Sequence, residues 1–270
     1  MTTTSNEHFA RIVAFDRVVQ TRVATRIEPT AHGTAFFHEP TPTIWDRNLV
    51  AIDVPADSFE ELADEAEEVQ RGLPHRMLIL DSDPDAEDKA RAARATGWLV
   101  ERHIAMVAGR PPDDDRPPKP VREVPGADLA VARRRGVARE DWAIRDPSAV
   151  DRVLEVDARL REVVHERGFA SFATGEVAAV AYLYSDDAGT IGQVEDVLTV
   201  PEHRGHGHGR SVVLAALAAS RAAGHEFTFL WADESDWPKE LYGKLGFDVV
   251  GRRWRFRRLA GGQSSRRPPA

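Results

Sequence analysis

The second half of the chain alternates short apolar runs with longer stretches in which apolar residues recur every three to four positions. Such runs predict buried strands, and such spacing predicts amphipathic helices. The predicted order is strand, helix, strand, helix, strand, over QVEDVLTVP (193–201), GRSVVLAALAASRAAG (209–224), EFTFLWAD (226–233), DWPKELYGKLG (236–246) and FDVVGRRWRFRR (247–258). Because helices that link strands cross over a sheet, this order predicts a sheet with helices on its faces.

The first half of the chain repeats this order with different residues. The corresponding segments are NLVAIDVP (48–55), DSFEELADEAEEVQRG (57–72), HRMLILD (75–81), DAEDKARAARATG (85–97) and WLVERHIAMVA (98–108). The first of these helices has Asp57 or Ser58 available as its cap and Gly72 as its stop. We infer two copies of one β–α–β–α–β unit, the first of which has diverged far from the second.

Further elements precede the second copy. Residues 148–168 place apolar residues on one helix face behind a Ser148 cap, and VAAVAYLY (177–184) with the turn SDDAG (185–189) predicts antiparallel strands. The predicted fold class is therefore α/β, with two mixed β-sheet domains that carry helices on both faces. In the closing strand, Trp254 and Phe256 are expected to face the core, while the alternating arginines line an exposed sheet edge.

A proline- and aspartate-rich segment, GRPPDDDRPPKP (109–120), separates the two halves. Proline cannot donate to a strand ladder and the acidic triplet repels itself, so this segment predicts an exposed linker. We predict one domain over residues 1–110, a linker over 111–120, a second domain over 121–260 and a disordered tail over 261–270.

Composition narrows the classes of protein that remain. The 270 residues are 42% hydrophobic and 30% charged, as expected for a globular protein with a substantial core. The absence of cysteine excludes disulfides, thiolate metal sites and a cysteine nucleophile. Without a recognisable secretory signal or a long apolar run, a cytoplasmic protein without membrane contact is expected. The formal net charge of −8 argues against nucleic acid as a partner.

The segment RGHGHG (204–209) follows a strand that ends at Val200 and Pro201, and it opens a helix. Glycines let successive backbone N–H groups turn inward without Cβ clashes, and the helix adds the positive end of its dipole. This context predicts an anion site suited to a diphosphate. The segment is not a P-loop, because no Lys-Ser/Thr pair follows the glycines, and its glycine spacing differs from the dinucleotide fingerprint.

The pattern Arg204-x-x-Gly207-x-Gly209 after a strand ending in Val-Pro resembles the pyrophosphate loop of the GNAT N-acetyltransferases. LYGKLGF (241–247) resembles the second signature of that family, and the two motifs occur in the family's order with one helix and one strand between them. The resemblance covers roughly residues 143–258 well and the first half only by topology. It implies two GNAT-like domains in tandem.

The resemblance implies an N-acetyltransferase that passes an acetyl group directly from acetyl-CoA, as cosubstrate, to a primary amine of a small molecule or peptide. Tyr242 matches the family tyrosine that protonates the departing thiolate, and Ser235 stands where many relatives carry an asparagine near the cofactor. The residues implied to hold the pantetheine arm and the pyrophosphate are Leu198, Thr199, Val200, Arg204, Gly205, His206, Gly207, His208, Gly209 and Arg210.

The chemistry also needs a base for the amine, and two acids precede the loop. A tyrosine is a credible acid for a thiolate, because their reference pKa values differ by only about 1.5 units. Strand alternation points Glu195 and Asp196 to opposite faces, so that only one of them can face the substrate. We prefer Glu195, since Asp196 lines up with apolar Val194 and Leu198, although a β-bulge would reverse this.

Several alternatives stay open. His203, His206 and His208 could form a metal site, but an anion loop directs side chains outward, so we predict no metal and expect solvated histidines. The first copy has ADSFEE (56–61) after its first strand, and these acids would repel a diphosphate, so it is not expected to bind CoA. A non-catalytic CoA-binding sensor or scaffold, and a nucleotide-phosphate protein, are the rival functions. The acceptor amine and the choice between monomer and homodimer are not readable.

Overall fold

The computed structural model describes residues 3–114, 116–139, 144 and 146–259. The predicted tail over 261–270 lies outside the described residues. The chain forms two compact units. Unit 1 holds residues 105–232 and 236–250 with the first residues of the chain, and unit 2 holds residues 5–104, 233–235 and the residues from 251 onward. The units divide inside two long strands and not at the proline-rich segment, and the domain boundaries proposed from the sequence stay a prediction.

The elements follow the predicted order. In the first half they are α1 (Thr3–Val23), β1 (Arg26–Pro29), β2 (Gly33–Phe37), a short 3-10 helix (Trp45–Arg47), β3 (Leu49–Ile52), α2 (Phe59–Val69), β4 (His75–Leu80), α3 (Ala86–Ala95) and β5 (Leu99–Ala108). In the second half they are β6 (Val121–Val124), a 3-10 helix (Gly126–Leu129), α4 (Ala130–Val137), α6 (Ser148–Val163), β7 (His165–Ala173), β8 (Glu176–Ser185), β9 (Ile191–Thr199), a 3-10 helix (Pro201–His203), α7 (His208–Ala222), β10 (Phe227–Asp233), α8 (Pro238–Lys244) and β11 (Phe247–Leu259). None of the described helices is both long and apolar enough to cross a membrane.

Unit 2 is a mixed sheet in the order β1-β2-β3-β4-β11-β5, with β3 and β4 parallel and β4 and β11 antiparallel. Trp254 and Phe256 of β11 are buried in its core beside Phe59 of α2, which confirms their predicted direction. The expectation of an edge strand is wrong, because β11 lies between β4 and β5. The alternating arginines therefore lie on the opposite, covered face, where Arg253 binds Asp16 and Asp81 at 2.6 and 2.5 Å.

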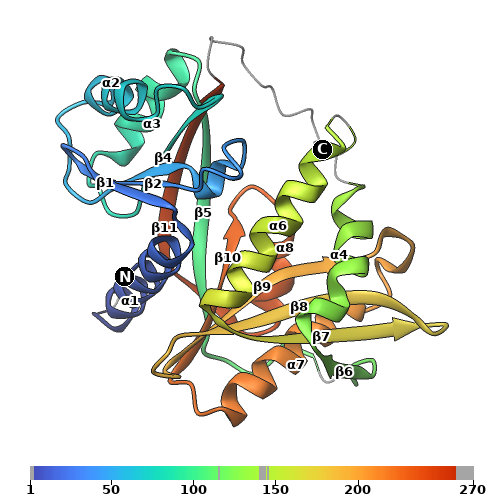
Figure 1. Cartoon of the computed structure of the whole chain (residues 1–270). Helices are drawn as coiled ribbons and strands as arrows, with labels where there is room; N and C mark the ends of the chain where they lie inside the picture. Colours follow the sequence, from blue (N-terminus) through green and yellow to red (C-terminus); the bar gives the residue numbers. More distant parts are fainter. Residues whose placement is uncertain (1–2, 115, 140–143, 145, 260–270) are drawn as a thin grey trace. The chain divides into compact units, whose positions relative to one another are not determined.

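Unit 1 is a mixed sheet in the order β5-β10-β9-β8-β7-β6, in which β10 and β9 are parallel and β9, β8, β7 and β6 are antiparallel. Helix α7 covers one face and helices α4 and α6 cover the other (Figure 1). The sheet thus carries helices on both faces, as predicted. Helix α6 begins at Ser148, but the cap position is Pro147, because the Ser148 hydroxyl donates to Asp146 at 2.5 Å instead.

The two copies exchange their last strands. The final strand of the second copy, β11, pairs with β4 of the first copy over residues 254–259, and β5 of the first copy lies beside β10 of the second. Consistent with this exchange, β5 and β11 each contribute residues to both compact units. A repeat read from the sequence does not reveal this exchange, because both strands carry the same apolar pattern.

Candidate functional site

The segment between β9 and α7 forms an open loop that ends in a helix N-terminus. Gly205 and Gly207 have φ angles of +77° and +83°, in the left-handed region that favours glycine. Gly207 is the N-cap of α7, and within the described part of the chain no side-chain capping hydrogen bond is found at this end. A Cβ built on either glycine meets nothing within 4 Å, so the space beside both glycines is open. The first N–H groups of α7 lack intrahelical acceptors, and together with the helix dipole they favour an anion here.

The side chains of the first α7 turn point into the protein, away from this open side. His208, Arg210 and Ser211 are all buried. The His208 ring contacts the Ser171 hydroxyl of β7 through Nδ1 at 2.8 Å, so the expectation of a solvated histidine is wrong for His208. Burial and the neighbouring cations lower its pKa below the usual histidine range, which keeps the ring neutral at pH 7. His206, by contrast, is exposed.

No group of three or more histidine, aspartate or glutamate side chains among the described residues is arranged to hold a metal ion. The loop accordingly presents backbone N–H groups and one exposed guanidinium rather than a set of converging ligands. Arg204 supplies that guanidinium, and its Nε donates to the Thr199 carbonyl at 3.3 Å. Such a surface suits a phosphate-bearing molecule better than a cation.

The strand before the loop parts from its parallel neighbour. The pairing of β9 with β10 covers Ile191, Gly192 and Gln193 and ends there, although β9 continues to Thr199. The β10-facing edge of residues 194–199 thus lies outside the ladder. This edge includes Leu198 and Thr199, two of the positions proposed to bind the pantetheine arm, and an extended amide chain could hydrogen-bond to such an edge.

A β-bulge in β9 turns both candidate bases to the same face. Glu195 lies opposite Tyr182 of β8, whereas Leu198 lies opposite Val180, so three steps on β9 match two steps on β8. Asp196 takes up the extra residue with a φ of +51°. Strict alternation therefore fails here. The prediction that these two acids point to opposite faces is wrong, because both side chains lie on the face that α4 and α6 cover.

Asp196 is held by an arginine that the sequence did not single out. Arg133 of α4 binds Asp196 at 2.5 Å and Asp157 of α6 at 3.1 Å, and its side chain is only 15% exposed. Burial disfavours the charge of Arg133, but the two carboxylates outweigh burial and raise its pKa above the usual arginine range. A carboxylate engaged in this way is poorly placed to accept a further proton. Asp196 is therefore the weaker candidate base.

The charge of Glu195 acts on Tyr242 of α8. The Gln193 amide, two residues earlier on the same strand face, donates to the Glu195 carboxylate. Tyr242 of α8 is buried, with its ring 6.1 Å from that of Phe247 in an edge-on arrangement. Burial, and then the negative charges of Glu195 and Asp236, raise the pKa of Tyr242 above the usual tyrosine range. The tyrosine hydroxyl is thus protonated at neutral pH, and a carboxylate lies within electrostatic reach.

The same face carries a further carboxyl group, that of Glu166, whose pKa is raised. Glu166 of β7 lies opposite Tyr184 of β8, and its Oε2 is buried without a hydrogen-bond partner among the described residues. Burial raises the pKa of Glu166 to about 7, although the Arg161 charge opposes this, and Asp196 and Asp157 add to the rise. The sequence gives no signal for Glu166 or Arg133, because their role depends on which elements pack together.

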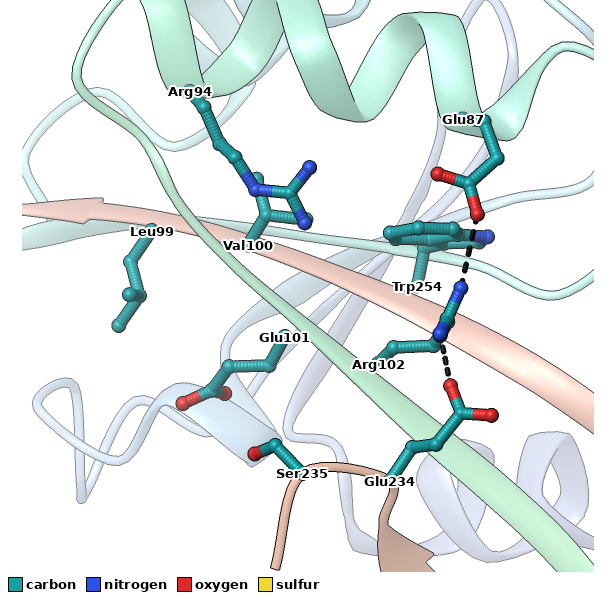
Figure 2. A pocket seen from close by; sticks show the side chains of 9 residues that line it. All are labelled: Glu87, Arg94, Leu99, Val100, Glu101, Arg102, Glu234, Ser235 and Trp254. Carbon is teal, nitrogen blue, oxygen red and sulfur yellow. Dashed lines mark hydrogen bonds and ion pairs between the residues drawn. The ribbon is translucent and has the colours of Figure 1, made fainter. Parts of the chain in front are cut away.

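Ser235 belongs to unit 2, where its hydroxyl donates to Asp233 at 2.7 Å. It lines a hollow of about 640 Å³ together with Glu87, Arg102, Glu234 and Trp254 (Figure 2). Arg102 bridges the two glutamates, and its guanidinium lies 5.2 Å from the centre of the Trp254 ring. The lining holds three glutamates and two arginines, so the hollow keeps a small excess of negative charge. A role for Ser235 in cofactor binding stays a prediction.

The first copy lacks both chemical features of the second. At the N-terminus of α2, the Ser58 hydroxyl accepts from the Glu61 N–H at 3.3 Å, and the Glu61 carboxylate accepts from the Asp57 N–H at 3.2 Å. The Ser58 hydroxyl thus occupies one of the N–H groups that an anion would need, and the Glu61 carboxylate places a negative charge at this helix end. When Gly97 is matched with Gly246, the position of Tyr242 corresponds to Ala93, which is fully buried. Neither an anion loop nor a phenolic acid is present in the first copy.

Residues 137–247 match the sequence model of the acetyltransferase (GNAT) family. A search of curated proteins found no significant match. Many solved structures share the fold. A conserved protein of unknown function from Staphylococcus epidermidis aligns with a TM-score of 0.69 at 12% identity, over 88% of this chain and 95% of that one. A GCN5-related N-acetyltransferase from Kribbella flavida aligns with a TM-score of 0.63 at 17% identity, over 96% and 98%.

A tandem GNAT protein from the clavulanic acid biosynthesis pathway aligns with a TM-score of 0.53 at 16% identity, over 75% of this chain and 70% of that chain. At these identities the likeness concerns the fold. It agrees with two related units in one chain, of which the family match covers only the second.

Proposed function

We propose, from the premise that residues 137–247 form a domain of the acetyltransferase (GNAT) family, that the chain transfers an acetyl group from acetyl-CoA to a primary amine. The observation that carries the proposal is the α7 N-terminus without a side-chain cap, behind two left-handed glycines and just after the strand that bears Glu195. The acceptor is a small molecule or a peptide amine.

The residues present fit acetyl-CoA as a cosubstrate. The loop from Arg204 to Arg210 offers backbone N–H groups for a diphosphate, and the space beside its two left-handed glycines is open. The edge of β9 at Leu198 and Thr199, beyond the end of the β10 ladder, offers amide partners for the pantetheine arm. The backbone N–H and carbonyl of Val200 already bind Ala178 and His203. When bound, the molecule supplies an activated acetyl thioester beside the strand.

Glu195 acts as the general base and Tyr242 as the general acid. Glu195 accepts a proton from the ammonium form of the acceptor, directly or through water, and leaves a nucleophilic amine. The amine nitrogen bonds to the thioester carbon as the C–S bond breaks, Tyr242 protonates the departing sulfur, and the second proton of the amine nitrogen restores the phenol. The raised pKa keeps Tyr242 protonated at neutral pH, but it widens the gap to the thiol beyond the difference of about 1.5 units between the reference values. Asp196, engaged by Arg133, keeps the bulge in place and takes no proton.

Titration calorimetry of acetyl-CoA into wild type and Gly207→Glu tests the proposal. Gly207→Glu adds a negative charge and a side chain to the open side of the loop, and we expect binding to be lost. The matched control is Gly189→Glu, in the turn between β8 and β9. Gly189 also has a positive φ, of +65°, and open space around its Cβ, so it carries the same strain and charge.

The outcomes separate the rival functions. Binding by wild type and Gly189→Glu but not by Gly207→Glu, followed by thiol release with an amine panel, supports the transferase. Binding without turnover on any amine would favour the sensor or scaffold. A preference for ATP over CoA would favour a nucleotide-phosphate protein, and absence of any binding by wild type would refute the use assigned to the loop.

A further inference from the structure

The proline-rich segment forms hydrogen bonds with α8 and with the start of α7, both in unit 1. We define the strap as residues 109–114 and 116–120. At its start, the Asp113 N–H donates to the Lys244 carbonyl of α8 at 2.8 Å, and the Arg110 guanidinium donates to the Gly243 carbonyl at 3.0 Å. Gly246 is required at this contact, because a Cβ there would lie 2.0 Å from the Arg110 carbonyl oxygen. The strap thus holds the end of the helix that bears the tyrosine.

The other end of the strap holds the start of α7. Arg210 donates through Nη1 to the Arg116 carbonyl at 3.0 Å, and through Nη2 to the Asp114 carbonyl at 3.2 Å and the Asp114 carboxylate at 2.7 Å. The Lys119 N–H donates to the Ser211 hydroxyl at 2.8 Å. Four hydrogen bonds therefore join the strap to two consecutive residues of the first turn of α7.

These contacts fix the turn whose backbone forms the anion loop. The Ser211 hydroxyl also donates to the Gly207 carbonyl at 2.8 Å, so the strap reaches the left-handed N-cap through one side chain. The Arg210 side chain is only 10% exposed and is directed into the strap, away from the open side of the loop. Its guanidinium is already engaged by three strap acceptors, so it is not placed to bind phosphate directly.

We propose that Arg210 is a positioning residue for cofactor binding, which acts through the strap residue Asp114 to hold the α7 first turn in its anion-binding shape. The proposal rests on the proposed function, because it concerns how the same loop binds acetyl-CoA. It assigns to the strap a role beyond joining the two copies. The first turn presents its N–H groups in a fixed array only while the guanidinium bridges three acceptors of the strap.

The direction in which Asp114→Ala changes the affinity for acetyl-CoA distinguishes a positioning role of Arg210 from direct attraction of phosphate by its charge. We expect Arg210→Gln to weaken acetyl-CoA binding about tenfold, as loss of hydrogen bonds from a charged group implies. Asp114→Ala leaves Arg210 its full charge and frees it from a carboxylate. If Arg210 attracted phosphate through its charge, Asp114→Ala would tighten binding, whereas positioning through the strap requires that it weaken binding. In the double variant the two losses should not add.

The matched control is Arg167→Gln. Arg167 also anchors α7 through its guanidinium, but at the far end, where it donates to the Ala219 carbonyl at 3.3 Å and binds Glu123 at 2.7 Å. It should lower the unfolding temperature without changing acetyl-CoA affinity. Arg210→Lys, which keeps the charge and reaches fewer acceptors, should give an intermediate affinity.

Calorimetry with acetyl-CoA measures the affinity of each variant, and thermal unfolding shows whether the variant is folded. Weakened binding in Arg210→Gln and Asp114→Ala, with Arg167→Gln unchanged, supports the proposal. Unchanged binding in Arg210→Gln, or tighter binding in Asp114→Ala, overturns it while leaving the proposed function intact. Asp114→Ala keeps the test available if Arg210→Gln does not fold, since Asp114 is 35% exposed. Failure of the wild type to bind acetyl-CoA overturns both proposals.

Discussion

Replacement of Arg133 by methionine tests the bridge between the bulge and the helices above it. Methionine keeps much of the aliphatic volume but removes the guanidinium that binds Asp157 and Asp196. The three side chains are 15%, 10% and 19% exposed, so both carboxylates would be left in a poorly hydrated site. Breaking a buried pair by removing one partner costs about 3–5 kcal/mol, and the residual exposure here favours the lower figure.

A loss of about 3 kcal/mol lowers the unfolding temperature of a domain of this size by about 6–12 °C. Arg134→Met is the control on the same helix, because Arg134 and its partner Asp151 are 53% and 69% exposed and their ion pair should contribute at most about 1 kcal/mol. Urea and thermal unfolding of both variants at pH 7 make the comparison. Equal, small losses in the two variants would refute the bridge as a stabilising feature.

Two further predictions concern titratable groups of unit 1. Tyr242→Phe should lower turnover by about 100-fold or more with acetyl-CoA affinity unchanged, measured by thiol release and calorimetry; an unchanged rate would mean that another group protonates the sulfur. Glu166 has a pKa raised by burial to about 7, so the native state holds a proton that the unfolded state releases above about pH 4.5. Stability should therefore fall as pH rises from about 5 to 8, by about 1–2 kcal/mol after allowance for partial solvation. Urea unfolding of Glu166→Gln should lack this part of the pH dependence, and an identical slope in wild type and variant would contradict the assignment.

Local patterns predicted much of the fold. Ser58 was one of two cap residues proposed for α2, and the structure selects it because its hydroxyl accepts from the N–H of Glu61, three residues on. The direction of Trp254 and Phe256 followed from strand alternation. The neighbours of β11 did not, because its alternating apolar and charged residues suit an edge strand as well as a central strand whose second face is covered. The acids that neutralise Arg253 come from α1 and from the end of β4, far away in sequence.

In the candidate site, too, some features could be predicted from the sequence, whereas others depend on tertiary contacts. The loop at Gly205 and Gly207 could be predicted from the sequence, because a left-handed backbone favours glycine and the residue type alone therefore indicates the conformation. Asp196 also adopts a left-handed φ, but aspartate occurs in many other conformations, so its presence does not predict this one. Its side chain is held by Arg133, which lies 63 residues earlier in a run of three arginines. The bulge therefore depends on a tertiary ion pair. Because both acids then lie on one face, alternation no longer separates Glu195 from Asp196. The guanidinium of Arg133 on Asp196 is the reason why Glu195 is the proposed base.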